Sequence, residues 1–228
     1  MKLIIERVTL IAAMALFGVT GVSGWLYFEQ RAVAQPVQDS QQSTENILKT
    51  YHEALYNNPR DPILGNPDGD VTIIEFYDYR CPFCKKVHPV VMQLLEDDGN
   101  IRYIAKEYPI LGPVSVLASQ AALASQKYGK YAEYSNALMS ARNLDDNLIF
   151  KIALDVGLDP LKLLDDIDAN ETEINDTIQE VLDLGQDMRL QGTPTFIIGD
   201  NLIPGAINRN VLDALVAQVR SKNTPASQ

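Results

Sequence analysis

The chain has 228 residues, of which 46% are hydrophobic and 21% charged, so it can form one packed domain and carry a targeting segment. The formal net charge of -11 argues against nucleic acids and anionic lipid headgroups as partners, because both require a basic surface. Only two cysteines occur, Cys81 and Cys84, and so close a pair is unlike a secreted disulfide scaffold and adds little stability through loop closure.

The first 34 residues are predicted to export the rest of the chain. Lys2 and Arg7 precede an apolar run over residues 8–28. A signal peptide would be cleaved after the small residues Ala32-Val33-Ala34. A retained membrane anchor is the alternative, because the apolar run has the roughly 20 residues that span a bilayer. Both interpretations place everything that follows on the far side of the membrane.

Residues 35–61 are predicted to hold a polar linker and a short amphipathic helix at Thr44–Tyr56. The helix either packs on its own domain or forms a partner helix through which copies of the chain associate. Residues 57–70 are rich in Pro, Gly, Asn and Asp, which predicts turns and a loop.

The central elements follow in alternating order. Residues 71–77 are predicted to be a buried strand, because they are apolar on both faces and rich in β-branched side chains. A helix is predicted from Pro82 to about Glu96, kinked at Pro89. Residues 101–106 are predicted to be a second strand.

The remainder is predicted to be a helical block over about residues 114–190, two strands near 195–198 and 202–203, and a helix at about 208–220. The order of strands and helices predicts an α/β thioredoxin-like fold with a helical insertion over residues 62–221. Residues 222–228 are predicted to be a flexible tail.

The cysteine pair lies where a strand gives way to a helix. Cys81 is predicted to be the helix N-cap, where free backbone N–H groups and the helix dipole favour a thiolate. Pro82 then occupies the first helical position. Cys81 is therefore the expected nucleophile, and Cys84, one turn later, is the expected resolving thiol.

Two other interpretations of the pair remain open. It could be half of a zinc or copper site, since thiolates suit both metals, but only His52 and His88 are available as histidine ligands. It could also be two inert buried cysteines.

Glu75 lies in the middle of the apolar strand, where a charge is costly. It either points out at a sheet edge, or it is a buried carboxyl with a raised pKa that exchanges protons with Cys84.

Two motifs, Glu75–Lys85 (EFYDYRCPFCK) and Gly192–Phe196 (GTPTF), together resemble the DsbA family of thioredoxin-fold oxidoreductases. The resemblance covers about Pro62–Val219. The leading helix and the Gly65–Asp70 segment (GNPDGD) look most like the ScsC-like branch. It implies thiol–disulfide exchange with cysteines of exported proteins, in the bacterial periplasm or at the outer face of the cytoplasmic membrane. The implied partner is a DsbB- or DsbD-like membrane protein, and no cofactor or metal ion is expected.

The resemblance also implies roles for individual residues. It makes Thr193-Pro194 a cis peptide bond facing the cysteines, and it makes Glu75 the buried carboxyl. Lys106 is a candidate for a lysine that tunes this carboxyl. The residues implied to contact substrate are Thr193, Pro194, Pro82 and Phe83.

The chain departs from the best-known family members between its cysteines, where Pro82-Phe83 replaces Pro-His and removes an imidazole that can stabilise the thiolate. Thr193 before the proline is more typical of isomerases. The function therefore stays open between an oxidase in oxidative protein folding, an isomerase or reductase kept reduced by a membrane partner, and a non-enzymatic copper- or zinc-binding thiol protein.

Overall fold

The computed structural model describes residues 44–223. The predicted leader at 1–34, the start of the linker and residues 224–228 lie outside the described part. The chain divides into two units, residues 1–46 and 47–228, and the sheet with its covering helices belongs to the second unit. Within residues 44–223, no helix combines the length and the apolar character needed to cross a membrane.

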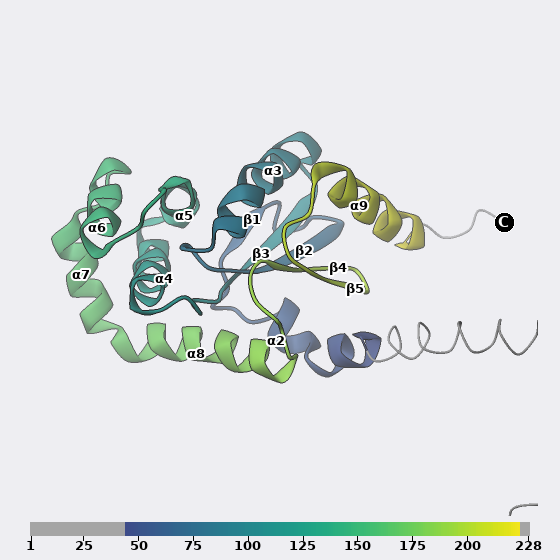
Figure 1. Ribbon diagram of the computed structural model, residues 1–228, viewed down its shortest axis with the longest axis horizontal. Helices are drawn as coiled ribbons and strands as arrows, with labels where there is room; N and C mark the ends of the chain where they lie inside the picture. Colours follow the sequence, from purple (N-terminus) through teal and green to yellow (C-terminus); the bar gives the residue numbers. More distant parts are fainter. Residues whose placement is uncertain (1–43, 224–228) are drawn as a thin grey trace, which may run out of the picture. The chain divides into compact units, whose positions relative to one another are not determined.

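A five-stranded mixed sheet forms the centre of the fold, in the order β1-β3-β2-β4-β5 (Figure 1). Strands β2 and β3 are parallel, and every other neighbouring pair is antiparallel. The strand bounds are Ile63–Gly65 (β1), Val71–Tyr77 (β2), Ile101–Glu107 (β3), Thr195–Ile198 (β4) and Asn201–Pro204 (β5).

Strand β1 corrects the prediction that residues 57–70 are only turn and loop. Its three residues pair with Arg102, Tyr103 and Ile104 at the edge of the sheet. So short a run has no periodicity to detect, and the hydrogen bonds to β3 define it as a strand.

Helices cover both faces of the sheet (Figure 1). Helices α3 (Pro82–Asp98) and α9 (Arg209–Asn223) pack against each other and the sheet. Side chains from α2 (His52–Tyr56) and α8 (Glu171–Asp187) join the core on the other face. Between β3 and β4, α8 is preceded by α4 (Pro113–Ser125), the 3-10 helix η1 (Gln126–Tyr128), α5 (Tyr131–Ser140), α6 (Asp146–Asp155) and α7 (Pro160–Ala169).

Helix boundaries follow local chemistry. The Asp145 carboxylate accepts a hydrogen bond from Leu148 N–H at the start of α6, and Asp159 caps α7 in the same way. Helix α3 continues through Pro89 and ends at Gly99, whose φ of 68° suits a residue without a side chain.

Alternation along β2 separates two cores. Ile73 and Tyr77 face a large core shared with α3, α9 and the insertion, whereas Ile74 and Phe76 face a smaller core. The smaller core includes Leu48 and Leu55 from the helical segment before β1. This segment is helical over residues 44–50 and again in α2. Its apolar residues from Ile47 onward therefore pack on their own domain, and association of copies through Thr44–Tyr56 stays a prediction.

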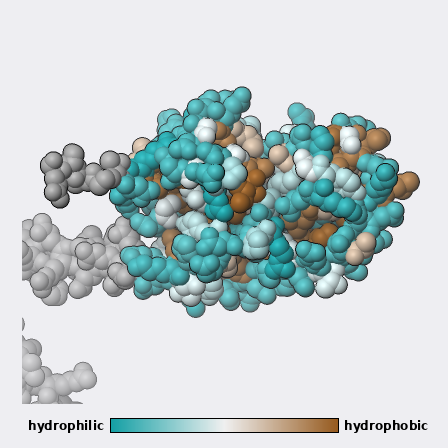
Figure 2. Space-filling model, turned by 180° about the vertical axis from the view of Figure 1, so that it is seen from behind, coloured by the Kyte–Doolittle hydropathy of each residue, from teal (hydrophilic) through white to brown (hydrophobic). Residues whose placement is uncertain are grey.

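The surface seen from behind is mostly hydrophilic, with separate apolar patches (Figure 2). The most exposed large apolar side chains of the described residues are Leu161 at 74%, Leu154 at 61% and Phe83 at 60%. Phe83 belongs to the cysteine motif, and the two leucines lie on α7 and α6.

Gly185 allows α8 to approach the sheet closely. A Cβ atom there would lie 2.5 Å from Cε2 of Tyr108. We expect Gly185→Ala to lower the free energy of unfolding by about 1–3 kcal/mol, because the overpacking outweighs the higher helix propensity of alanine. Denaturant unfolding measures this, with Gln186→Ala at the exposed neighbouring position as the control. An equal effect of the two substitutions would contradict the close approach.

Candidate functional site

Cys81 lies at the junction of β2 and α3. Its backbone is extended, with φ -72° and ψ 118°, and Pro82 opens the helix behind it. Its carbonyl accepts the first helical hydrogen bond from Lys85 N–H at 3.1 Å, and its own N–H donates to Asp78 O at 3.0 Å. Cys81 is therefore the N-cap residue, as predicted, and faces the free N–H groups of the first turn.

This position makes Cys81 acidic. The pKa of its thiol is lowered to about 5, first because Cys84 donates a hydrogen bond to the thiolate. The Thr193 side chain and the backbone N–H groups of Cys84 and Phe83 lower it further, while burial acts in the opposite direction. In its neutral form the thiol donates to the carbonyl of Thr193 at 3.2 Å.

Cys84 has the opposite character. Both cysteines are free thiols, and Cys84 is fully buried one turn into α3. Burial raises its pKa far above that of an ordinary cysteine, and the Cys81 hydrogen bond and the charge of Glu75 act in the same direction. The pair thus joins a thiol ionised at neutral pH to one that stays protonated.

Glu75 is buried in the middle of the sheet and does not point out at an edge, being 1% exposed. It lies opposite Ala105 on β3 and Phe196 on β4. The hydroxyl of Tyr103 donates a hydrogen bond to its carboxyl at 2.8 Å. Burial raises the pKa of Glu75 to about 8, although the Tyr103 hydrogen bond lowers it.

Lys106 does not tune this carboxyl, so that prediction was wrong. Its ammonium group pairs with Asp61 and donates to Ala54 O. Because side chains alternate along β3, Lys106 and Tyr103 lie on opposite faces of the sheet. Tyr103 was not predicted as the partner of Glu75. Tyr103 and Lys106 point to opposite faces of the sheet, and the register between β2 and β3 decides which of the two shares a face with Glu75.

The Thr193-Pro194 bond is cis and directly precedes β4. The hydrogen bond from Cys81 to Thr193 O brings this turn to the cysteines, although 112 residues separate the two in the chain. Phe83 is 60% exposed on the first turn of α3, next to Pro82. The structure therefore brings together the residues predicted for the site from both motifs.

The histidines considered as metal ligands have other contacts. His88 Nε2 lies 2.6 Å from Asn136 Oδ1, and burial lowers the pKa of His88. His52 stacks on Tyr56. Across residues 44–223, no group of three or more His, Cys, Asp or Glu side chains is arranged to hold a metal ion.

A family model described as thioredoxin matches residues 57–218. Among curated proteins, the chain is 29% identical over 164 residues to the Na(+)/H(+) antiporter NhaA 3 of Salinispora tropica. This match covers 69% of the chain but only 24% of the antiporter, so the chain spans about a quarter of that relative.

Solved structures match over nearly their whole length. A thioredoxin-like oxidoreductase from Silicibacter pomeroyi is 38% identical with a TM-score of 0.71, covering 74% of this chain and 97% of the other. The thiol-disulfide exchange protein alpha-DsbA2 from Wolbachia pipientis is 32% identical with a TM-score of 0.75, covering 79% and 98%. The catalytic domain of Proteus mirabilis ScsC is 29% identical with a TM-score of 0.71, covering 78% and 98%.

The family match, these structural neighbours and the two dissimilar thiols agree with one another. The chain therefore belongs to the thioredoxin family and, within it, to the DsbA- and ScsC-like thiol–disulfide oxidoreductases.

Proposed function

We propose that this protein exchanges the Cys81–Cys84 disulfide with thiols of exported proteins during oxidative folding in the bacterial envelope. The observation that carries the proposal is the placement of the two thiols: Cys81 is the N-cap of α3 with its sulfur 3.2 Å from the Thr193 carbonyl, whereas Cys84 is fully buried one turn later. In keeping with this placement, the pKa of Cys81 is lowered to about 5 and that of Cys84 is raised. A thiol of low pKa is a good leaving group, and stabilising it as a thiolate makes the disulfide more oxidising.

The exchange runs in two steps. A substrate thiolate attacks Cys81 Sγ, the Cys81–Cys84 bond breaks, and Cys84 leaves and takes a proton from Glu75. A second substrate thiolate then attacks the substrate sulfur of the mixed disulfide, and Cys81 leaves as a thiolate. The substrate gains one disulfide, and the protein keeps the two electrons as a dithiol.

Glu75 suits the proton-transfer role because it is buried on the strand that leads to the cysteines and interacts electrostatically with both. With a pKa of about 8 it is mostly protonated at neutral pH and can donate to the leaving Cys84. In the reverse direction its carboxylate accepts the Cys84 proton.

Substrate contacts are proposed at Thr193, Pro194, Pro82 and Phe83. The Thr193 carbonyl already accepts a hydrogen bond from the reacting sulfur, and a substrate strand can pair with the same backbone. Phe83 is an exposed aromatic side chain next to the nucleophile and suits an apolar substrate residue.

The location and partners are part of the proposal. The basic residues followed by an apolar run support export to the periplasm or to the outer face of the cytoplasmic membrane, whether the leader is cleaved or retained. A DsbB-like membrane protein would reoxidise the dithiol. If the protein works as an isomerase or reductase, a DsbD-like partner would keep it reduced, and Thr193 before the proline favours this alternative.

The reduction potential of the whole chain, equilibrated with glutathione, distinguishes the two directions. We expect a value near about -120 mV, as for strong oxidants, because the lowered pKa of Cys81 stabilises the reduced form. A value of about -180 mV or below would reject the oxidase proposal in favour of isomerase or reductase work. Failure to form the disulfide would reject thiol–disulfide exchange altogether.

Alkylation of the reduced protein across a pH series tests the nucleophile. We expect the rate to be half-maximal at about pH 5, since only the Cys81 thiolate reacts and its pKa is lowered to about 5. The Cys81→Ser variant should label very slowly throughout the neutral range because Cys84 is buried and protonated. A midpoint near about 8.5, as for a free cysteine, would show that the N-cap does not activate Cys81.

The proton-transfer role of Glu75 is tested with an aromatic disulfide that releases a coloured thiolate. Cys81 attack releases the first thiolate, and Cys84 then loses its proton, attacks Cys81 Sγ and releases the second. The second rate should rise with pH through about 8, because Glu75 accepts the proton only after it ionises. Glu75→Gln should lower this rate by about tenfold or more and remove the pH step.

Tyr103→Phe removes the hydroxyl that lowers the pKa of Glu75, so its pH step should move upward. Tyr108→Phe is the matched control, because that tyrosine belongs to the smaller core on the other face of the sheet. If both Glu75→Gln and Tyr103→Phe keep the wild-type pH dependence of the second release, Glu75 does not transfer the proton of Cys84.

A further inference from the structure

A second buried carboxyl, Glu107, ends strand β3 and has no part in the exchange described above. It is 1% exposed. Its Oε1 accepts hydrogen bonds from the hydroxyls of Tyr77 at 2.9 Å, Tyr79 at 2.7 Å and Tyr131 at 2.6 Å. Its Oε2 accepts from Ser119 at 2.7 Å. These five residues are called the Glu107 cluster.

The cluster favours an ionised carboxyl held by hydroxyl groups. A carboxylate only accepts hydrogen bonds, so it can receive the protons of the surrounding hydroxyls. The Tyr77 hydroxyl also lies 2.5 Å from that of Tyr131 and 3.3 Å from that of Tyr79, so the tyrosine protons are shared within one network around the carboxylate. Among residues 44–223, no cation forms a salt bridge with Glu107. Burial raises its pKa to about 7, while the hydrogen bonds lower it. Losing a donor therefore leaves a buried charge less satisfied, which is costly.

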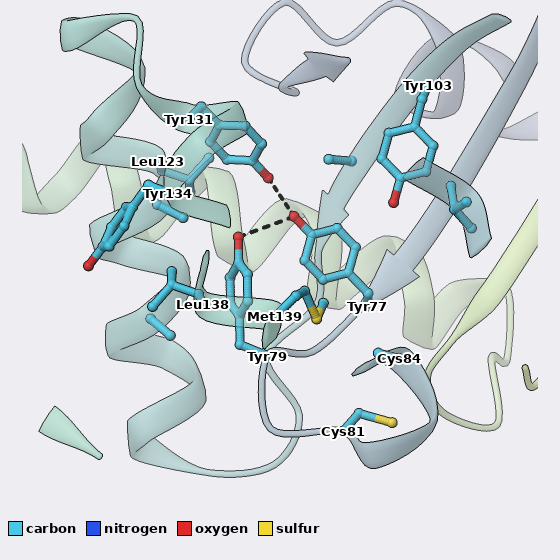
Figure 3. Packing of buried hydrophobic residues seen from close by; sticks show 14 of the residues in the cluster. Tyr77, Tyr79, Cys81, Cys84, Tyr103, Leu123, Tyr131, Tyr134, Leu138 and Met139 are labelled. Carbon is cyan, nitrogen blue, oxygen red and sulfur yellow. Dashed lines mark hydrogen bonds between the residues drawn. The ribbon is translucent and has the colours of Figure 1, made fainter. Parts of the chain in front are cut away.

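The donors come from separate parts of the fold. Tyr77 ends β2, Tyr79 belongs to the segment before the nucleophile, and Ser119 and Tyr131 lie on α4 and α5 of the helical insertion. Figure 3 shows the hydroxyls of Tyr79 and Tyr131 converging on that of Tyr77. One carboxylate thus joins the sheet, the insertion and the approach to the nucleophile.

Asp78, between the two tyrosines, completes this connection. Its buried carboxylate accepts from Arg80 N–H at 2.7 Å, Leu111 N–H at 2.9 Å and the Ser115 hydroxyl at 2.8 Å. Its carbonyl accepts from Cys81 N–H at 3.0 Å. Hydrogen bonds therefore fix the segment from Tyr77 to Cys81 at successive residues, so a displacement of Tyr79 would be transmitted to Cys81.

We propose that Glu107 is a positioning residue for Cys81, which fixes the segment carrying the nucleophile against the helical insertion. It acts through Tyr79 and Tyr77 and not by contact with the sulfur. This inference rests on the proposed function, in which Cys81 is the attacked and leaving sulfur.

Position matters because short hydrogen bonds stabilise the Cys81 thiolate. They come from the Cys84 thiol and from the N–H groups of the first turn of α3. Such bonds weaken steeply when distance or angle changes. A looser Tyr79 segment should therefore raise the pKa of Cys81 even though no charge near the sulfur has changed.

The helix α5 offers a matched pair of tyrosines for the test. Tyr131 donates to Glu107, whereas Tyr134, also buried, donates to Ile149 O at 2.9 Å and points away from the cluster (Figure 3). Tyr131→Phe and Tyr134→Phe each remove one buried hydroxyl from the same helix. Both should lower the free energy of unfolding, by about 1 kcal/mol for Tyr134→Phe, whose partner is a neutral carbonyl, and by about 1.5–3 kcal/mol for Tyr131→Phe, whose partner is a carboxylate.

The reduction potential of the whole chain, equilibrated with glutathione at pH 8, separates the two variants, because Glu107, whose pKa is about 7, is ionised at this pH. Tyr131→Phe should weaken the stabilisation of the Cys81 thiolate by about threefold, which makes the potential about 14 mV more negative. Tyr134→Phe should leave the potential at the wild-type value. Ser119→Ala, which removes the donor to the other oxygen, should act like Tyr131→Phe.

Other outcomes overturn the proposal. If Tyr131→Phe and Ser119→Ala are less stable but keep the wild-type reduction potential at pH 8, Glu107 serves stability alone. If Tyr134→Phe lowers the potential as much as Tyr131→Phe, the effect comes from general loosening of α5. The disulfide exchange of the wild-type protein, measured in parallel, tests the proposed function separately, because its absence would not depend on any of these substitutions.

Discussion

The parallel register between β2 and β3 is the constraint on which the site depends. It places Ala105 opposite Glu75 and Glu107 opposite Tyr77. Because side chains alternate along a strand, Glu75, Tyr103 and Glu107 lie on one face, and Tyr103 donates to Glu75 from the side away from Glu107. A slip of one residue would turn each β3 side chain to the other face and remove both the tuning of Glu75 and the partner of Tyr77.

The site obtains two unlike thiols from one helical turn. Cys81 lies before the first turn of α3, where unpaired N–H groups and the neighbouring Cys84 thiol stabilise its thiolate. Cys84 lies inside the turn, where water is excluded and the charge of Glu75 opposes ionisation. The difference in pKa between the two cysteines therefore comes from their positions at the strand–helix junction. It does not need the imidazole that the best-known family members carry at the position of Phe83.

Local pattern was enough to predict strand β2 and the helix that follows Cys81, because each is encoded by contiguous residues. The partner of Glu75 was not predictable in this way, since it depends on the register between strands. Lys106 has the right charge but faces the other core, and Tyr103 takes its place. Strand β1 was missed for the same reason, because its pairing partner lies far away in the chain.

Glu75 and Glu107 differ in the number of hydrogen-bond donors around them, and this difference fits the roles proposed for them, which are proton transfer for Glu75 and positioning for Glu107. Both are 1% exposed on the same face of the sheet. Within the described residues Glu107 accepts from four hydroxyls, whereas Glu75 accepts from Tyr103. More donors to the ionised form lower the pKa, in agreement with about 7 for Glu107 and about 8 for Glu75. Protonating Glu107 would require one of its hydrogen-bond donors to turn away, so Glu107 is poorly suited to repeated proton transfer. Glu75 has fewer bonds to rearrange, and it lies beside the thiol that must gain and lose a proton.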